Sequence, residues 1–127
     1  MGSGAVYVVN PSGGGFTGTP VSAVINAILN GAVHFLTIYT VPANKKCIVT
    51  SIMSYNTTRV TTRIQTGAEI SGSDVWNYGE YNVPQNKQVC FIGTLYLVAG
   101  GKVRAYFNGG VAGDITWNMF TGLLMDA

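Results

Sequence analysis

The chain has 127 residues, a formal net charge of +2 and only 9% Asp, Glu, Lys and Arg, against roughly 25% in an ordinary soluble domain. One domain with a real core fits this length, and the small net charge argues against a protein that binds nucleic acid or an anionic membrane. Because a free monomer normally carries more charge to stay apart from its copies, we expect neighbours to cover much of the surface, as in an assembly component.

An N-terminal arm is expected over residues 1–31, ahead of a β-sandwich domain over residues 32–127. The arm holds a strand-like segment followed by a glycine run at 13–15, which gives the segment reach. A strand of this kind can add to a free sheet edge, so we expect it to pack on a neighbouring subunit or on a capsid. The interface residues predicted in this segment are Val6, Tyr7 and Val8.

The segment 20–30 is the one candidate for a short helix. Its apolar residues at 21, 24, 25 and 28 follow the spacing of one helix face, and Gly31 comes next as a stop. Val and Ile also favour strands, which leaves a strand as the alternative.

From residue 32 onward the pattern is that of strands separated by Gly, Asn and Pro. We expect an all-β, jelly-roll-like antiparallel β-sandwich of about eight strands with an extended N-terminal arm. Residues 67–73 are expected to be turn and loop. The strands predicted in this part of the chain are 33–41, 46–55, 60–65, 75–78, 87–98, 102–107 and 115–124.

Some of these strands are apolar on both faces. In residues 89–97, alternate positions give Val, Phe, Gly, Leu and Leu on one face and Cys, Ile, Thr and Tyr on the other. A strand with one face in water alternates between apolar and polar residues, so this pattern indicates a second layer over the outer face. In one small domain, that layer is most simply the arm or another subunit.

The two cysteines, Cys47 and Cys90, each lie inside a strand-like run, and we expect two buried free thiols. A disulfide is the alternative, but it needs an oxidising compartment, for which the sequence carries no address. Two cysteines and one histidine have no metal-ligand spacing, so no metal or other cofactor is expected.

Candidate catalytic groups are few. His34 lies in mid-strand beside Phe35 without a nucleophile or second acid nearby in the sequence, so we expect it to bond the backbone or to face solvent. Glu69 and Asp74 share one loop region, with Glu80 soon after, where a carboxylate pair could be built, although acids also gather in a loop by chance. The chain is therefore not expected to be an enzyme.

Aromatic side chains gather in one loop-rich stretch, where Trp76, Tyr78 and Tyr81 stand beside Asn side chains. An aromatic face with neighbouring amides suits a sugar ring, but large aromatics also anchor protein contacts. We expect these three aromatics to contact protein, with sugar binding as the alternative. Trp117 is expected in the core, because its neighbours at strand spacing are apolar.

Residues 38–52, which read IYTVPANKKCIVTSI, are followed by Tyr-Asn-Thr at 55–57. A strand that ends in YTVPA, a basic turn and an apolar strand that runs into Asn-Thr resemble small virion proteins of tailed bacteriophages, and AGGKVR at 99–104 fits the same outline. Over residues 33–107, the chain resembles a phage decoration (cement) protein or a related tail or fibre module. The resemblance implies a jelly-roll or similar sandwich and a role in assembly, and it carries across no catalytic residue.

These features together predict a structural virion protein that binds the phage capsid surface and stabilises contacts between capsid subunits. Its expected partners are other copies of itself, in a homotrimer, and the major capsid protein, with no nucleic acid and no membrane. We expect it in the virion after assembly in the host cytoplasm. The alternative is a carbohydrate-binding or receptor-binding module of a phage fibre or tail, with a glycan as its partner.

Overall fold

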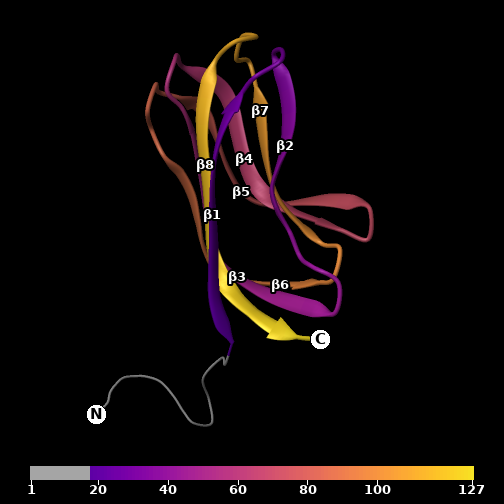
Figure 1. Ribbon diagram of the computed structural model, residues 1–127. Coiled ribbons are helices and arrows are strands. Elements are labelled where there is room, and N and C mark those ends of the chain that lie inside the picture. Colours follow the sequence, from indigo (N-terminus) through magenta and orange to yellow (C-terminus); the bar gives the residue numbers. More distant parts are fainter. Residues whose placement is uncertain (1–17) are drawn as a thin grey trace, which may run out of the picture.

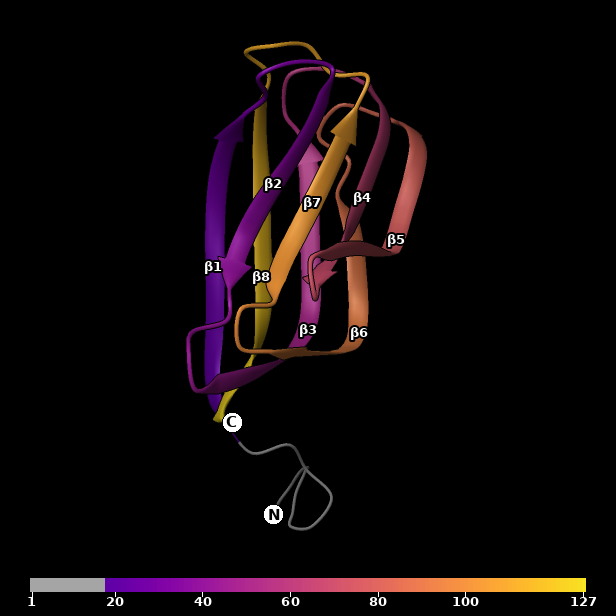
Figure 2. The ribbon, with the colours of Figure 1, turned by 90° about the vertical axis from the view of Figure 1, so that its right-hand side faces the viewer.

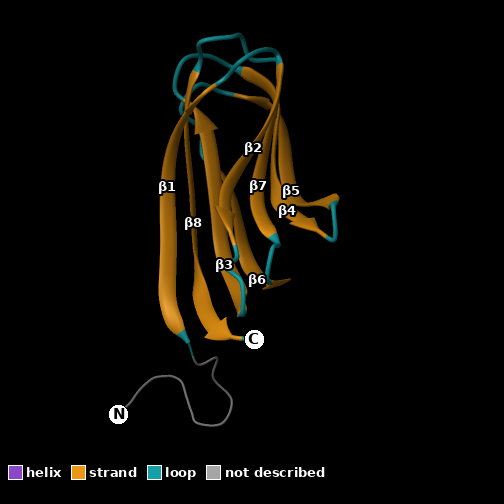
Figure 3. Cartoon of the chain, turned by 45° about the vertical axis from the view of Figure 1, so that its right-hand side comes forward, coloured by secondary structure: helices purple, strands orange, loops and turns teal. Residues whose placement is uncertain are grey.

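Eight antiparallel strands and no helix make up residues 18–127, the part of the chain that this computed structural model describes (Figures 1 and 3). They form two four-stranded sheets that lie face to face. No helix long and apolar enough to cross a membrane occurs in these residues. The strands are β1 (Thr19–Ile28), β2 (Val33–Thr40), β3 (Lys45–Asn56), β4 (Thr61–Ile70), β5 (Ser73–Val83), β6 (Val89–Val98), β7 (Lys102–Asn108) and β8 (Ile115–Asp126).

The order of the strands is that of a jelly roll. One sheet runs β1-β8-β3-β6 and the other runs β2-β7-β4-β5, which Figure 2 shows in front of the first. The pairs β1–β8, β2–β7, β3–β6 and β4–β5 are successive parts of one long antiparallel ribbon that is folded over on itself. The predicted all-β, jelly-roll-like sandwich is therefore confirmed, whereas residues 1–17 of the predicted arm lie outside the described part.

A single hydrophobic core fills the space between the two sheets. It includes Ile52 and Phe120 from one sheet and Ile64 and Phe107 from the other, all of them without exposed surface. Full burial of a side chain of this size contributes about 1.5–3 kcal/mol, so this core is the main source of stability.

The helix predicted over residues 20–30 is wrong, because these residues belong to β1, the edge strand beside β8. The apolar residues of β1 serve both of its faces. Val21 and Ile25 pack against the core, whereas Val24 and Ile28 are exposed on the other side. The spacing that resembled a helix face thus arises from a strand that is apolar on both sides. β1 also belongs to the sandwich rather than to the predicted arm.

The loop predicted over residues 67–73 is also wrong, because β4 and β5 extend through it and meet in a hairpin. Only Ser71 and Gly72 turn, at positive φ values of 52° and 83°. Two successive residues at positive φ give the backbone twist that a two-residue hairpin needs. Within β4, Gly67 is required by space, since a Cβ there would lie 2.0 Å from the carbonyl oxygen of Val75.

An extra residue in β3, Thr50, changes which side chains face the core. Before it, odd-numbered residues such as Val49 are in the core, and after it even-numbered residues such as Ile52 are. Against β8, the register steps from Val49 to Ser51, so Thr50 has no opposite residue. A bulge of this kind shifts the side-chain alternation by one position and keeps β3 in phase with the strands beside it.

One buried carboxylate, that of Asp114, joins three of the loops that gather at one end of the sandwich (Figure 3). It accepts hydrogen bonds from Nδ2 of Asn56 at 3.0 Å and from Nε of Arg59 at 2.8 Å. The backbone N–H of Val111 also donates to it, at 3.0 Å. The carbonyl oxygen of Asp114 in turn accepts the backbone N–H of Leu29 at 2.8 Å. The β1–β2, β3–β4 and β7–β8 loops are therefore held together through one residue.

The protonation of Asp114 links this network to pH. Burial works to raise the pKa of Asp114, but hydrogen bonds from Asn56, Arg59 and the Val111 N–H outweigh it and hold the pKa below its ordinary 3.8. A carboxylate whose pKa falls on folding stabilises the fold above its ordinary pKa and loses this contribution as the pH drops through the lowered value. We therefore expect the loop network to weaken in acid.

Asp114→Asn is expected to lower the free energy of unfolding at neutral pH by about 1.5–3 kcal/mol, the usual contribution of hydrogen bonds to a charged group. The free energy of unfolding of this variant should also fall less steeply than that of the unsubstituted protein as the pH drops below about 4. Asp126→Asn is the matched control, because Asp126 pairs with Lys45 at 2.6 Å but its side chain is 88% exposed. Urea unfolding across this pH range measures both variants. Equal stability of the two would contradict the role assigned to Asp114.

Candidate interaction surfaces

The outer face of the sheet β1-β8-β3-β6, which we call the apolar face, carries rows of side chains that cross all four strands. Residues paired across strands lie on the same side of a sheet, so each row belongs to one surface. The three complete rows are Val24–Met119–Met53–Cys90, Ser22–Thr121–Ser51–Ile92 and Pro20–Leu123–Ile48–Tyr96. Ile48 is buried beneath this outer layer and does not belong to the core between the sheets.

Large apolar side chains of the apolar face are exposed to solvent. Ile92 is 83% exposed, and Trp117 is 39% exposed. Lys46 is the one charged residue among the outward positions of these four strands. Soluble monomers rarely leave a contiguous apolar area of this kind bare, so it is a candidate binding surface. Its exposed apolar members are Val24, Ile28, Ile92, Tyr96, Val98, Ile115 and Trp117.

Hydroxyl groups at the centre of the apolar face bond to one another. Oγ1 of Thr121 lies 2.9 Å from Oγ1 of Thr50 and 2.6 Å from Oγ of Ser51. Oγ1 of Thr50 also donates to the carbonyl oxygen of Thr121, at 3.1 Å. Polar groups that already have partners lose little when a neighbour displaces water from them. An apolar partner can therefore cover the centre of this face at small cost.

Trp117 is not in the core, contrary to the sequence prediction. It points outward in β8, and the residues on either side of it, Thr116 and Asn118, are the ones without exposed surface. Oγ1 of Thr116 donates to the carbonyl oxygen of Ala27 at 2.9 Å, and Nδ2 of Asn118 donates to Oγ1 of Thr116 at 3.0 Å. These hydrogen bonds allow the polar side of β8 to be buried and leave its apolar side in solvent.

The two cysteines lie in different environments, and both are free thiols. Cys47 is fully buried, as predicted, and this burial raises the pKa of its thiol. Cys90, which was also predicted to be buried, is exposed. It lies on the apolar face beside Met53 because β6 turns that side of its backbone outward.

The outer face of the other sheet, β2-β7-β4-β5, carries ion pairs, and we call it the charged face. The guanidinium of Arg104 lies 3.8 Å from a carboxylate oxygen of Glu69 and 3.5 Å from one of Asp74. Nζ of Lys102 lies 3.4 Å from the second carboxylate oxygen of Glu69. The two acids that the sequence analysis considered as a catalytic pair thus share a basic partner.

The three predicted contact aromatics lie on β5, an edge strand, and not in a loop. Trp76 and Tyr81 are on the charged face, where the guanidinium of Arg63 stands 4.8 Å from the Tyr81 ring centroid. Tyr78 pairs with the buried Thr66 and so lies toward the inner side. The structure does not bring these three rings together, and their contact with protein stays a prediction. The other predicted interface residues, Val6, Tyr7 and Val8, lie outside the described residues.

Trp76 has ring neighbours that the sequence did not connect with it. The centroid of its ring lies 6.2 Å from that of Phe35 in β2 and 5.8 Å from that of Tyr106 in β7. Phe35 and Tyr106 are themselves 4.7 Å apart. We call these three residues the aromatic trio. Only the pairing of the strands reveals it, since its members are far apart in the sequence.

The remaining titratable candidates make structural hydrogen bonds. Nδ1 of His34 accepts the backbone N–H of Asn30 at 3.2 Å. Glu80 accepts hydrogen bonds from Lys87 and from the Tyr78 hydroxyl, and these lower the pKa of its carboxyl group. Within residues 18–127, no three His, Cys, Asp or Glu side chains come together in a way that could hold a metal ion.

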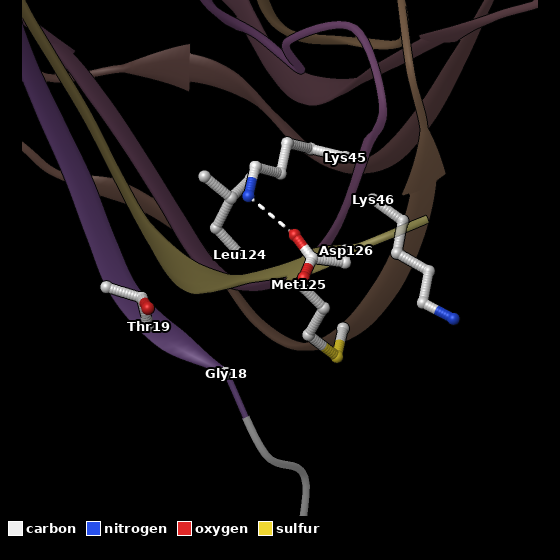
Figure 4. Close-up of a pocket in the computed structure, with 7 residues that line it drawn as sticks. All are labelled: Gly18, Thr19, Lys45, Lys46, Leu124, Met125 and Asp126. Atoms are coloured by element: carbon white, nitrogen blue, oxygen red, sulfur yellow. Dashed lines mark hydrogen bonds and ion pairs between the residues drawn. The ribbon is translucent and has the colours of Figure 1, made fainter.

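A recess of about 520 Å3 lies at the end of the sandwich where the arm joins β1 (Figure 4). Nζ of Lys45 and Oδ1 of Asp126 meet across it at 2.6 Å. Its polar lining and wide mouth differ from the enclosed apolar pockets that bind small molecules. The residues that line it are Gly18, Thr19, Lys45, Lys46, Leu124, Met125 and Asp126.

No family model matches this sequence, and no curated protein matches it. Among solved structures, it is similar to a chain of the acidic stable capsid structure of Helicobacter pylori bacteriophage KHP30, with a TM-score of 0.59, 11% identity and coverage of 86% of this chain and 93% of that chain. It is also similar to the globular domain of zebrafish complement 1qA, with a TM-score of 0.49, 11% identity and coverage of 86% of this chain and 99% of that chain. A third similar structure is the virus-like particle of the extra small virus of the prawn Macrobrachium rosenbergii, with a TM-score of 0.42, 10% identity and coverage of 88% of this chain and 85% of that chain. The similarity to the phage capsid chain establishes a shared fold.

Cys90 is expected to react rapidly with a thiol reagent wherever the apolar face is bare, whereas Cys47 should react only on unfolding. Absorbance at the release of the reagent's chromophore measures the two rates. Cys90→Ser serves as the control, because it should remove the rapid phase and leave the slow one. Two thiols that react at one common rate in folded protein whose apolar face is bare would contradict this placement.

Proposed function

We propose that this protein is a structural component of a phage particle that decorates the capsid surface and stabilises contacts between capsid subunits. The observation that carries the proposal is the apolar face, on which Ile92 and Trp117 are exposed and Lys46 is the charged residue. A protein with such a surface stays soluble by having it covered, which favours a part of an assembly. The fold shared with a bacteriophage capsid chain and the resemblance of residues 38–52 to phage virion proteins support the same role.

The occupant that we propose for the apolar face is a second copy of this chain, within a homotrimer. Around a threefold axis, the apolar face of each copy would contact both of its neighbours. These contacts bring little like charge together, because the face is almost without charge, and they remove apolar surface from water. A closed cyclic arrangement leaves no copy with an uncovered face. Three copies with their charged faces outward would suit a threefold position on an icosahedral shell.

The arm is the segment that we propose to bind the capsid protein. It joins the sandwich at Gly18, which lies beside Leu124 and Met125 of β8 at the end where the chain also finishes (Figure 1). β1 is an edge strand, so one of its sides offers free backbone groups. Adding a strand to a sheet edge supplies hydrogen bonds without charged side chains, which suits a chain with so few of them.

Ile92→Lys is expected to convert the trimer into monomers, because the new ammonium group would have to be buried without a partner. Tyr81→Lys is the matched control, since Tyr81 is also exposed but lies on the charged face, and this variant should stay trimeric. Light scattering after size-exclusion chromatography, at micromolar concentration, measures the mass of each. A mass of one chain for the unsubstituted protein would count against the proposed trimer.

Deletion of residues 2–15 should leave the sandwich folded, because the core is made by residues between 21 and 124, but it should weaken binding to the capsid. Co-sedimentation with capsids that lack this protein measures the affinity. An arm of full length in which Val6, Tyr7 and Val8 are replaced by Ser separates the effect of these side chains from that of length. Unchanged affinity in the deletion variant would remove the arm from the binding site.

A further inference from the structure

The aromatic trio forms a continuous surface in the middle of the charged face. Its rings are tilted by 30° to 40° relative to one another, so they are not stacked face to face, and each can present part of its own face outward. Phe35 is 48% exposed, and Trp76 and Tyr106 are half-buried. The trio is therefore an accessible aromatic platform and not a piece of core.

Two glycines leave space beside this platform, because they have no side chain. Gly67 is the β4 partner of Trp76, so no side chain of β4 crowds the indole at that position. Gly79 is the β5 partner of Gln65, and a Cβ at residue 79 would lie 2.7 Å from Cγ of Gln65. The Gln65 side chain thus occupies space that a larger residue would fill.

Hydrogen-bonding groups border the platform on both sides. Gln65 is the β4 partner of Tyr106, and Nδ2 of Asn108 donates to the Tyr106 hydroxyl at 3.0 Å. In the next row, Nη1 of Arg104 donates to Oγ1 of Thr37 at 2.9 Å. Amide, phenol, hydroxyl and guanidinium groups therefore surround a central apolar area.

We propose that the aromatic trio is a binding platform for a neutral saccharide. The C–H face of a pyranose ring packs on an aromatic face, while the hydroxyls at its rim exchange hydrogen bonds with side chains such as Gln65 and Asn108. Arg104 and Lys102 are already paired with acids, and the remaining cation of this face, Arg63, stacks on Tyr81 outside the trio, so no unpaired cluster of charge faces an ionic ligand. This pairing selects a neutral sugar over a charged one.

A saccharide suits this platform better than a protein partner does. A protein surface broad enough to cover the trio would also bury the ion pairs of Arg104 with Glu69 and Asp74, and removing water from ion pairs is costly. The centres of protein interfaces are depleted of charged residues for the same reason. A sugar ring covers the aromatic rings alone. The apolar face, on the opposite side of the sandwich, has the uncharged character of a protein interface, so the saccharide site does not rest on the proposed assembly role.

Calorimetric titration of the full-length protein with maltohexaose, cellohexaose, chitohexaose and a β-1,4-galactose hexamer tests this site. At least one of these probes is expected to bind. Trp76→Ala should weaken the binding of that probe by about tenfold or more, as for other losses of aromatic stacking, and Trp76→Phe should retain most of it. Tyr81→Ala is the matched control, because Tyr81 is on the same strand and face but outside the trio, and it should bind normally.

Titration with a soluble saccharide measures the affinity of each single site. This affinity does not include the avidity that a trimer would show on an array of immobilised sugars. Ile92→Lys should therefore lose the trimer yet keep its saccharide affinity, and this separates a failure of the assembly proposal from a failure of the saccharide site. The site would be overturned if none of the four probes binds to the protein, or if Trp76→Ala binds a probe as tightly as Tyr81→Ala does. It would also be overturned if Trp76→Ala keeps its affinity for every probe but no longer binds the capsid. The last outcome would assign the trio to a protein partner.

Discussion

A β-strand has two faces, and the core of a sandwich can cover only one of them. In β6, Val89 and Leu97 are buried between the sheets, while Ile92 and Tyr96 are just as apolar and point away from the core. The exposed part of these outward side chains adds no hydrophobic stabilisation to one chain, because the hydrophobic effect acts only when surface leaves water. They become favourable once another molecule lies on them. The low charge of the chain and its bare sheet therefore have the same cause, and both fit a protein that completes its burial by assembly.

The two sheets divide the surface chemistry of the molecule between them. The sheet β2-β7-β4-β5 carries outward ion pairs such as that of Arg104 with Asp74, whereas Lys46 is the charged residue on the outside of β1-β8-β3-β6. A body with one ionic and one apolar side has a preferred orientation in any assembly, because only the ionic side remains favourable in water. The same separation would let the proposed saccharide site and the proposed assembly surface share one small domain without competing for residues.

Much of the fold could be predicted from the sequence, because Gly, Asn and Pro separate the apolar runs that form strands. The alternation of apolar and polar residues was misleading where both faces of a strand are apolar and where the buried face is polar. Residues 20–30 resembled a helix because apolar positions from both faces of β1 combine into helical spacing. Trp117 was assigned to the core because, of two adjacent strand residues, the apolar one is normally the buried one. Here Asn118 is buried instead, and its hydrogen bonds make that burial possible. Trp76 was predicted to contact protein, which stays a prediction. Its ring neighbours Phe35 and Tyr106 were missed, because they come together only through the register of strands that are far apart in the sequence.

The bulge at Thr50 determines which residues of β3 face the outside of the molecule. Upstream of it the even positions of β3, such as Ile48, contribute to the outer layer, and downstream the odd positions, such as Met53, do. Because Val49 and Ser51 pair with consecutive residues of β8, Gly122 and Thr121, removal of Thr50 would leave a regular strand with the same side chains outward. If Thr50 stayed but the bulge were lost, one half of β3 would slide along β8, and Ile52 would exchange places with Met53. A substitution at an outward position changes one side chain of the surface, whereas loss of the bulge with Thr50 retained would change which side chains of β3 form that surface. The bulge therefore decides which residues of β3 lie in the core and which lie on the outside of the molecule.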